Sequence, residues 1–232
     1  MPFPAITFCM LILAHRANLQ GPHSCEENSI AACQAALEAG FGLETDLRLD
    51  GNGSFYISHD PLPDAAHPSF AFYEKLFRSW PDQVIAVNVK ELGYESKLID
   101  LYRDGTLGNS AFYFDFELLE PQTPGQAQRK IRSLTGGSNV RLASRLSDRH
   151  EPLASCLAIP SDIVWADEFD SLWLTGNHIE QVKSSGRKIY AVSPELHNFS
   201  RDEMRKRWLD FKTWGVDGIC TDYALEALDF FR

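Results

Sequence analysis

Two carboxylates and an imidazole lie close together in one short stretch of the chain. Glu44 and Asp46 are two residues apart, and on a β-strand this spacing places both side chains on one face. Residues 50–53, Asp-Gly-Asn-Gly, favour a tight turn, and residues 55–57 have the composition of a second short strand. A hairpin closed by this turn is expected to pair Asp46 with His59. The stretch therefore predicts oxygen ligands for a hard cation, Mg²⁺ or Ca²⁺, beside a group that can transfer a proton.

The same residues also fit an ordinary strand followed by a turn. Glu44 and Asp46 could form the solvated face of the strand, and Asp60 before Pro61 could cap the turn. The functional interpretation is favoured because polar residues recur wherever another apolar segment of the chain ends.

A second histidine follows the first apolar segment, residues 7–14. His15 and His59 are candidates for a general base and a general acid, because imidazole titrates near neutral pH. Arg16 can bind phosphate oxygens with its forked guanidinium group. A lone histidine at a strand end is more often structural, so the hypothesis depends on the two histidines converging.

A third apolar segment, residues 84–89, contains Asn88 and is followed by Lys90. Asn88 offers a carbonyl oxygen to a cation, and Lys90 offers a positive charge to a phosphate. Carboxylates at the ends of later segments are expected to support the site or to face the substrate: Asp115, Glu117, Glu195 and Asp222. Arg145 is interpreted as an ion-pair partner. The other histidines are expected at the surface: His23, His67, His150, His178 and His197.

Apolar segments alternate with helical patterns along the whole chain. The eight expected strands cover residues 7–14, 43–47, 84–89, 111–116, 139–143, 162–165, 188–192 and 218–220. Such alternation predicts parallel βα units. We therefore expect one α/β domain over residues 1–232, a single (β/α)8 TIM-type barrel with an extra β-hairpin after the second strand. In this fold the carboxyl ends of the strands form the face that holds active sites.

Composition restricts the partners. The chain has 232 residues, of which 44% are hydrophobic, and a formal net charge of −10, which argues against nucleic acid as a partner. The first apolar segment is too short to cross a membrane and follows no basic residue, so we expect neither a signal peptide nor stable membrane insertion. The five cysteines have irregular spacing, which indicates free thiols in a reducing compartment and predicts a cytoplasmic protein.

Four short motifs carry a resemblance to a known family. His15-Arg16, Glu27-Asn28, Glu44-Thr45-Asp46 and His59-Asp60 resemble, in order and spacing, the signature of the glycerophosphodiester phosphodiesterases. Residues 218–222 resemble the Thr-Asp near the end of that family. The resemblance implies a distorted barrel, one divalent cation and a small phosphodiester substrate. It also implies a role for each matching residue: catalysis for His15 and His59, metal binding for Glu44 and Asp46, and phosphate contacts for Arg16 and Lys90.

Two positions depart from the pattern of that family. The third strand of the family usually carries Glu-x-Lys, whereas this chain has Asn88-Val89-Lys90. Asparagine keeps a carbonyl ligand but lacks one negative charge, so we expect weaker metal binding unless Glu27 or a carboxylate of residues 115–117 compensates. The family usually has His-Arg-Gly, whereas Ala17 follows Arg16 here and is expected to restrict the turn.

Three functional hypotheses follow. The first is metal-dependent hydrolysis of a glycerophosphodiester to glycerol 3-phosphate and an alcohol. The second is a phospholipase-D-like enzyme acting on a lysophospholipid, which would need an apolar entry for an acyl chain. The third is a barrel that binds a phosphorylated ligand without turnover, and Asn88 is the residue that favours it.

Overall fold

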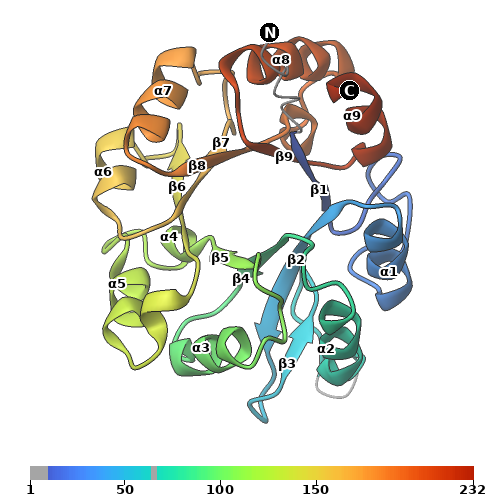
Figure 1. Ribbon diagram of the computed structural model, residues 1–232, viewed down its shortest axis with the longest axis vertical. Helices are drawn as coiled ribbons and strands as arrows, with labels where there is room; N and C mark the ends of the chain where they lie inside the picture. The colour runs from blue at the N-terminus through green and yellow to red at the C-terminus, as the bar shows by residue number, and fades with distance from the viewer. Residues whose placement is uncertain (1–9, 64–66) are drawn as a thin grey trace, which may run out of the picture.

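In the part of the chain that the structure describes, residues 10–63 and 67–232, eight parallel strands form a central ring surrounded by helices (Figure 1). The structure is a computed structural model. The strands of the ring are β1 Leu11–His15, β2 Gly42–Leu49, β4 Ile85–Val89, β5 Phe112–Phe114, β6 Ala143–Ser147, β7 Ile163–Asp167, β8 Lys188–Val192 and β9 Gly218–Thr221.

The strands follow the order β5-β4-β2-β1-β9-β8-β7-β6 around the ring. The two ends of this order meet through a parallel bridge between Tyr113 and Leu142. The alternation in the sequence therefore corresponds to a (β/α)8 TIM-type barrel, as predicted.

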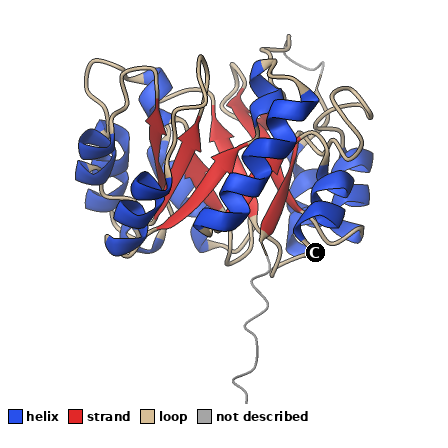
Figure 2. Ribbon diagram, turned by 90° about the horizontal axis from the view of Figure 1, so that it is seen from above, coloured by secondary structure: helices blue, strands red, loops and turns tan. Residues whose placement is uncertain are grey.

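The helices form an outer layer around the strands (Figure 2). They are α1 Ile30–Glu38, α2 Phe70–Arg78, α3 Glu95–Arg103, α4 Phe116–Leu119, α5 Gln126–Ser133, α6 Leu153–Ala158, α7 Gly176–Ser184, α8 Arg201–Trp214 and α9 Ala224–Phe231, with the short 3-10 helices η1 Gly137–Asn139 and η2 Pro194–His197. None of these helices is both long and apolar enough to cross a membrane.

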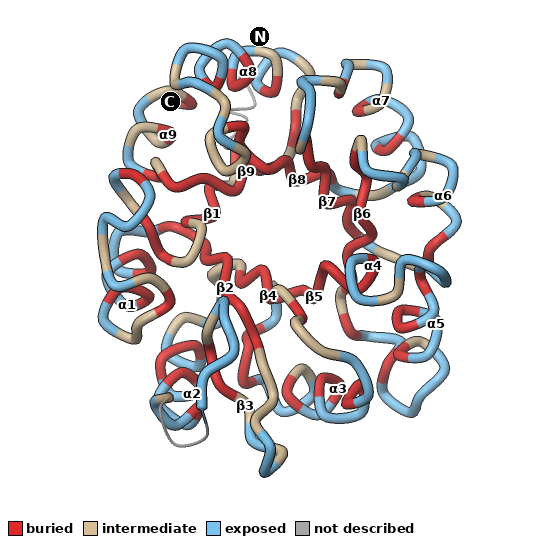
Figure 3. The backbone as a smooth tube through the Cα atoms, turned by 180° about the vertical axis from the view of Figure 1, so that it is seen from behind, coloured by how far each residue is buried: buried red, intermediate tan, exposed pale blue. Residues whose placement is uncertain are grey.

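The interior of the barrel is filled by side chains from alternate positions of the strands. Phe112 is fully buried, with its ring centroid 6.0 Å from that of Trp165 and 5.5 Å from that of Tyr190. The strands are buried along the ring, whereas the outer faces of the helices are exposed (Figure 3). These packed rings fill the interior of the barrel, and in this fold active sites lie at the carboxyl-terminal ends of the strands.

The predicted hairpin forms, but its register differs from the prediction. β3 Phe55–Ile57 lies outside the ring and pairs antiparallel with β2 (Figure 1). Leu49 pairs with Phe55, and the amide of Ser58 donates to the carbonyl oxygen of Asp46 at 3.0 Å. The side chain of Asp50 accepts hydrogen bonds from the amides of Asn52 and Ser54, which fixes the loop length. Asp46 therefore faces Ser58, and the predicted pairing with His59 is wrong by one residue.

Two other strand predictions need correction. The fifth strand was expected over residues 139–143, but β6 begins only at Ala143 because residues 137–139 form η1 after Gly136, which has φ 81°. The fourth strand ends at Phe114, because Asp115 takes a left-handed conformation with φ 71° and leads into α4. Residues 7–9 of the first predicted strand lie outside the described residues.

Candidate active site

The polar residues of the site occupy the last inward-facing positions of the strands. His15 ends β1 and pairs in register with Glu44 of β2, and Asp46 of β2 pairs with Asn88 of β4. Positions two residues earlier on these strands carry Leu13, Gly42 or Ala86, which belong to the packed interior or the wall of the barrel. The alternation of side chains along each strand thus places an apolar layer beneath a polar one.

A cavity of about 230 Å³ opens above this polar layer. Its lining includes seven of the residues predicted from the sequence: His15, Arg16, Glu44, His59, Asn88, Lys90 and Asp115. A larger hollow of about 650 Å³ lies elsewhere, between the hairpin and helices α2 and α3, and contains none of them. The structure thus brings the two predicted catalytic histidines to one cavity, although they come from separate elements.

His15 is held by a carboxylate from the far end of the sequence. Its Nδ1 lies 2.8 Å from Oδ1 of Asp222, and its Nε2 lies 3.9 Å from Oε2 of Glu44. Burial lowers the pKa of His15, but the hydrogen bond to Asp222 and the charges of Glu44 and Asp222 outweigh burial, so the pKa is raised. With Nδ1 engaged, Nε2 is the nitrogen available for proton transfer.

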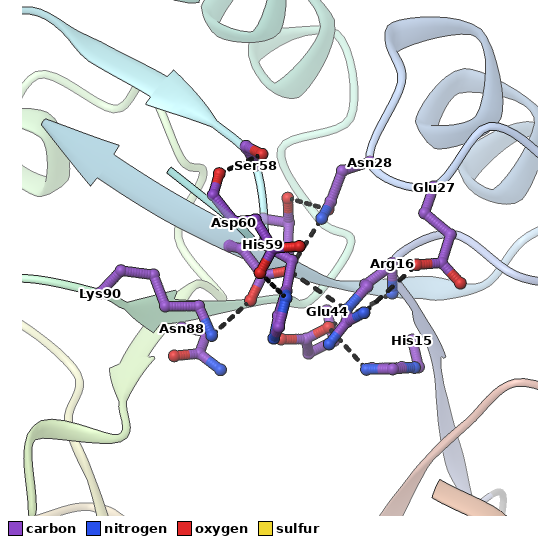
Figure 4. A network of polar contacts seen from close by, with 12 residues as sticks. His15, Arg16, Glu27, Asn28, Glu44, Ser58, His59, Asp60, Asn88 and Lys90 are labelled. Carbon is purple, nitrogen blue, oxygen red and sulfur yellow. Dashed lines mark hydrogen bonds and ion pairs between the residues drawn. The ribbon is translucent and has the colours of Figure 1, made fainter. Parts of the chain in front are cut away.

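The side chains of Arg16 and Lys90 extend toward the centre of the site from opposite sides (Figure 4). Both pair with the buried carboxylate of Asp46. Nζ of Lys90 lies 2.8 Å from Oδ1 of Asp46, and Nε of Arg16 lies 3.4 Å from its Oδ2. Asn28 also donates to Oδ2 of Asp46 at 2.8 Å. Burial raises the pKa of Asp46, but Lys90, Arg16 and the bond from Asn28 outweigh it, so the pKa is lowered.

Glu44 is less well compensated than its neighbour. Its side chain is 3% exposed, and its Oε2 accepts a hydrogen bond from the backbone amide of Arg16 at 3.3 Å. Burial, together with the negative charge of Asp46, raises the pKa of Glu44 to about 7. An added positive charge beside Glu44 and Asp46 would therefore stabilise the ionised form of both buried carboxylates.

The turn that carries Arg16 is left-handed. Arg16 has φ 48° and Ala17 has φ 67°, and the amide of Asn18 donates to the carbonyl oxygen of His15 at 2.9 Å. Ala17 is 1% exposed, so its methyl group is accommodated within the core. The alanine that departs from the family pattern therefore still permits a tight turn after His15.

His59 follows the hairpin and is the most exposed of the proposed catalytic residues. Its side chain is 45% exposed, and its Nδ1 lies 2.9 Å from Oδ1 of Asp60. Arg48 donates to the backbone carbonyl oxygen of His59 at 3.0 Å, which anchors the chain at this point. His15 and His59 thus each have a carboxylate at Nδ1, which leaves Nε2 as the nitrogen available for proton transfer.

Asn88 and Asp115 lie together at the ends of β4 and β5. Nδ2 of Asn88 donates to Oδ2 of Asp115 at 2.9 Å, which leaves the carbonyl oxygen of Asn88 available as a ligand. Glu117, in contrast, is buried and does not line the cavity, and Gln128 donates to it at 2.8 Å. Burial raises the pKa of Glu117 to about 7.

Glu195 and Asp222 support the site without lining the cavity. Glu195 accepts hydrogen bonds from the hydroxyl groups of Ser193 and Thr221 and from the amide of Asp222 at 3.2 Å. Glu27 likewise lies outside the cavity, where Asn18 donates to it at 2.8 Å and Arg16 at 3.3 Å.

Three further residues line the same cavity: Arg145, whose interpretation as an ion-pair partner is confirmed, and Asp167 and His197, which the sequence analysis did not assign to the site. Arg145 is 1% exposed and donates to Asp115, to Glu151 at 3.1 Å and to Asp167 at 3.0 Å. The expectation that His197 lies at the surface is wrong, because its side chain is 20% exposed and its Nε2 lies 2.5 Å from Oδ1 of Asp167. The apolar segment of residues 162–165, which ends two residues before Asp167, was the signal that could have placed this carboxylate at the mouth.

Among residues 10–63 and 67–232, no three His, Cys, Asp or Glu side chains are arranged to hold a metal ion. The oxygen donors predicted for a cation are Glu44, Asp46 and Asn88, and only two of them are carboxylates. In the same ranges Cys25, Cys33, Cys156 and Cys220 are free thiols, as expected, whereas Cys9 lies outside the described residues.

Fold and site together define a (β/α)8 barrel whose mouth combines three histidines with basic side chains and paired carboxylates. No family model matches the chain, and no curated protein matches it by sequence. In fold it is similar to a candidate glycerophosphodiester phosphodiesterase from Galdieria sulphuraria, with TM-score 0.72 and 16% identity over 97% of this chain and 98% of that one. It is also similar to a glycerophosphoryl diester phosphodiesterase from Parabacteroides distasonis, with TM-score 0.68 and 14% identity over 97% and 87% of the two chains.

The barrel alone does not single out that activity. A 7,8-dihydropteroate synthase from Vibrio fischeri also matches, with TM-score 0.52 and 10% identity over 97% of this chain and 92% of that one. The likenesses therefore show the fold, and the function must be argued from the side chains at the mouth.

Proposed function

We propose that this protein hydrolyses a small phosphodiester, most favourably a glycerophosphodiester, to glycerol 3-phosphate and an alcohol with the help of a divalent cation. The observation that carries the proposal is the meeting of His15 and His59 with Arg16 and Lys90 at one cavity. The barrels with similar folds that are described as phosphodiesterases support this reaction class.

Arg16 and Lys90 are the proposed phosphate contacts. The guanidinium group of Arg16 can donate two parallel hydrogen bonds to phosphate oxygens, and Lys90 adds a point charge. Both are already held by Asp46, so little side-chain entropy is lost when the phosphate binds. Negative charge that develops on the phosphoryl oxygens in the transition state would be stabilised by these fixed cations.

His15 and His59 are the proposed proton carriers. One imidazole takes a proton from the attacking water as the new P–O bond forms, and the other gives a proton to the alkoxide that leaves when the old P–O bond breaks. After the reaction the first imidazole releases its extra proton to solvent and the second takes one up from solvent, which restores both starting states. Asp222 fixes the tautomer of His15, so Nε2 of His15 is the nitrogen that takes or gives the proton.

The donor set at the mouth fits a hard divalent cation. Glu44 and Asp46 supply carboxylate oxygens, Asn88 supplies a carbonyl oxygen, and the raised pKa of buried Glu44 reflects negative charge that a cation would neutralise. When bound, Mg²⁺ or Ca²⁺ would supply electrophilic stabilisation of the phosphoryl oxygens.

The test is release of glycerol 3-phosphate from glycerophosphodiesters in the presence of Mg²⁺ or Ca²⁺. EDTA, His15→Ala and His59→Ala are each expected to abolish it, whereas His150→Asn, at an exposed histidine away from the cavity, should leave it unchanged. Full activity of His59→Ala would refute the acid–base assignment. Turnover of choline lysolipids alone would favour the phospholipase-D-like alternative, and binding without turnover under any cation would favour a binding protein.

A further inference from the structure

His197 ends the 3-10 helix η2 and lines the cavity, and like His15 it has a carboxylate at one ring nitrogen. Its Nε2 lies 2.5 Å from Oδ1 of Asp167, and its ring centroid lies 4.3 Å from that of Phe169. Phe169 is in turn covered by the guanidinium groups of Arg145 and Arg149, at 5.2 and 4.3 Å from its centroid. Such a restrained imidazole beside a cavity is arranged to contact a ligand.

The bonding of Asp167 determines which nitrogen of His197 carries the proton. Arg145 donates to Oδ2 of Asp167 at 3.0 Å, and Asp167 remains an ionised acceptor with a lowered pKa because the bond from His197 and the charge of Arg145 outweigh its burial. Nε2 of His197 must therefore be the donor. In neutral His197, Nδ1 is then a hydrogen-bond acceptor, and among the described residues it has no partner.

Three carboxylates share one buried guanidinium beside His197. Asp115, Glu151 and Asp167 all pair with Arg145, and Asp115 and Asp167 also line the cavity. The nearby guanidinium of Arg149 is paired with its own carboxylate, Asp170. Trp165 and Phe114 add aromatic surface, with ring centroids 4.2 Å apart. A positively charged group that can also donate a hydrogen bond is the ligand chemistry complementary to this wall.

We propose that His197 is a specificity-determining residue for the leaving alcohol, and that its Nδ1 accepts a hydrogen bond from an N–H of a protonated amine on that alcohol. The inference rests on the proposed phosphodiesterase function. It assigns to this protein glycerophosphodiesters whose alcohol carries a primary, secondary or tertiary ammonium group, and it disfavours a quaternary ammonium group, which has the same charge but no N–H.

The test compares glycerophosphoethanolamine with its N-methyl, N,N-dimethyl and N,N,N-trimethyl derivatives. The first three retain at least one N–H when protonated, and only the last has none. The kcat/KM values of the first three should agree within about threefold, and the value for the trimethyl compound should fall by about fivefold or more, as expected for one lost hydrogen bond. A gradual decline with each methyl group would indicate steric exclusion and would overturn the inference.

Two variants of His197 separate a substrate contact from a structural role. His197→Gln keeps a donor for Asp167 but has no acceptor at the position of Nδ1. The ratio of its kcat/KM values for the dimethyl and trimethyl substrates should therefore approach one. His197→Asn keeps an amide group near the position of Nδ1 and should retain part of the ratio. The exposed His150, changed to Asn, serves as the control and should keep the full ratio.

The outcomes distinguish the inference from the proposed function on which it rests. If none of the four substrates is hydrolysed, the proposed function fails. If they are hydrolysed and folded His197→Gln keeps the wild-type ratio, the function stands and the role of His197 is refuted. The wild-type series decides the question even if a variant does not fold, because the absence of a step between the dimethyl and trimethyl compounds is sufficient to refute the inference.

Discussion

Nδ1 of His15 lies 2.8 Å from Oδ1 of Asp222, although 207 residues separate the two in the chain. The contact forms because β1 and β9 are neighbours in the ring, which places the residue after Thr221 beside the end of β1. Asn18 donates to the same oxygen of Asp222 at 2.9 Å, so the carboxylate is held from two sides. The first and last strands of the barrel thus jointly position one proposed catalytic group.

Replacement of Asp222 by Asn should lower the pKa of His15 and reduce kcat by about 100-fold, because both the charge and the preferred tautomer are lost. The raised pKa of His15 stabilises the fold fully below its ordinary value of 6.5, and this contribution is lost as the pH rises through the raised value. The stability difference between wild type and variant should therefore be larger at pH 6 than at pH 9. NMR titration of His15 and thermal melts measure these effects.

The control for this variant is Asp229→Asn, which changes a carboxylate that is 78% exposed near the C-terminus. It should alter neither the titration of His15 nor kcat. An unchanged His15 pKa in Asp222→Asn would contradict the account of the pair.

Replacement of Glu44 by Gln should stabilise the cation-free protein at alkaline pH. Burial and Asp46 raise the pKa of Glu44 from 4.5 to about 7, so its contribution to stability is present below pH 4.5 and is lost as the pH rises through 7. At pH 8 the ionised carboxylate costs on the order of 3 kcal/mol, which Gln removes. Urea melts at pH 5 and pH 8 measure the difference, and equal effects at the two pH values would contradict it.

Replacement of Asn88 by Glu should tighten divalent-cation binding by about tenfold, because one more carboxylate joins Glu44 and Asp46. Without a cation the same change should destabilise the protein, since Asn88 donates to Asp115 at 2.9 Å and a carboxylate would repel it. Isothermal titration calorimetry with Mg²⁺ and Ca²⁺ measures the affinity. Asn109→Glu adds the same charge at an exposed site and should have no such effect; unchanged affinity in Asn88→Glu would exclude position 88 as a ligand.

Replacement of Arg145 by Leu should destabilise the protein by about 3–5 kcal/mol, because the buried carboxylates of Asp115 and Asp167 lose their partner. The matched change Arg149→Leu removes a guanidinium that is 55% exposed and paired with Asp170 at 2.7 Å, and should cost far less stability because solvent screens this ion pair. Chemical denaturation of both variants tests the contrast. Similar losses for the two would mean that the buried network contributes no more than a surface ion pair.

The order of elements and much of the site could be predicted from local pattern. Apolar segments located the strands, and strands β3 and β8 have the predicted bounds because both are flanked by clear turn or helix signals. The spacing of Glu44 and Asp46 was enough to place both on one face, since side-chain direction alternates along a strand whatever surrounds it.

The sequence by itself determined which residues are inward-facing within each strand, because that depends only on backbone geometry over a few residues. The tertiary structure alone decided which residues meet across the barrel: Asp222 with His15, Arg145 with three carboxylates, and His197 with Asp167. Strand β6 contains Arg145 and two serines, so its sequence does not resemble that of a buried strand. The buried cation of Arg145 is tolerated only because carboxylates from other parts of the fold neutralise it. The register of Ser58 with Asp46 likewise followed from hydrogen bonds of the Asp50 loop rather than from composition.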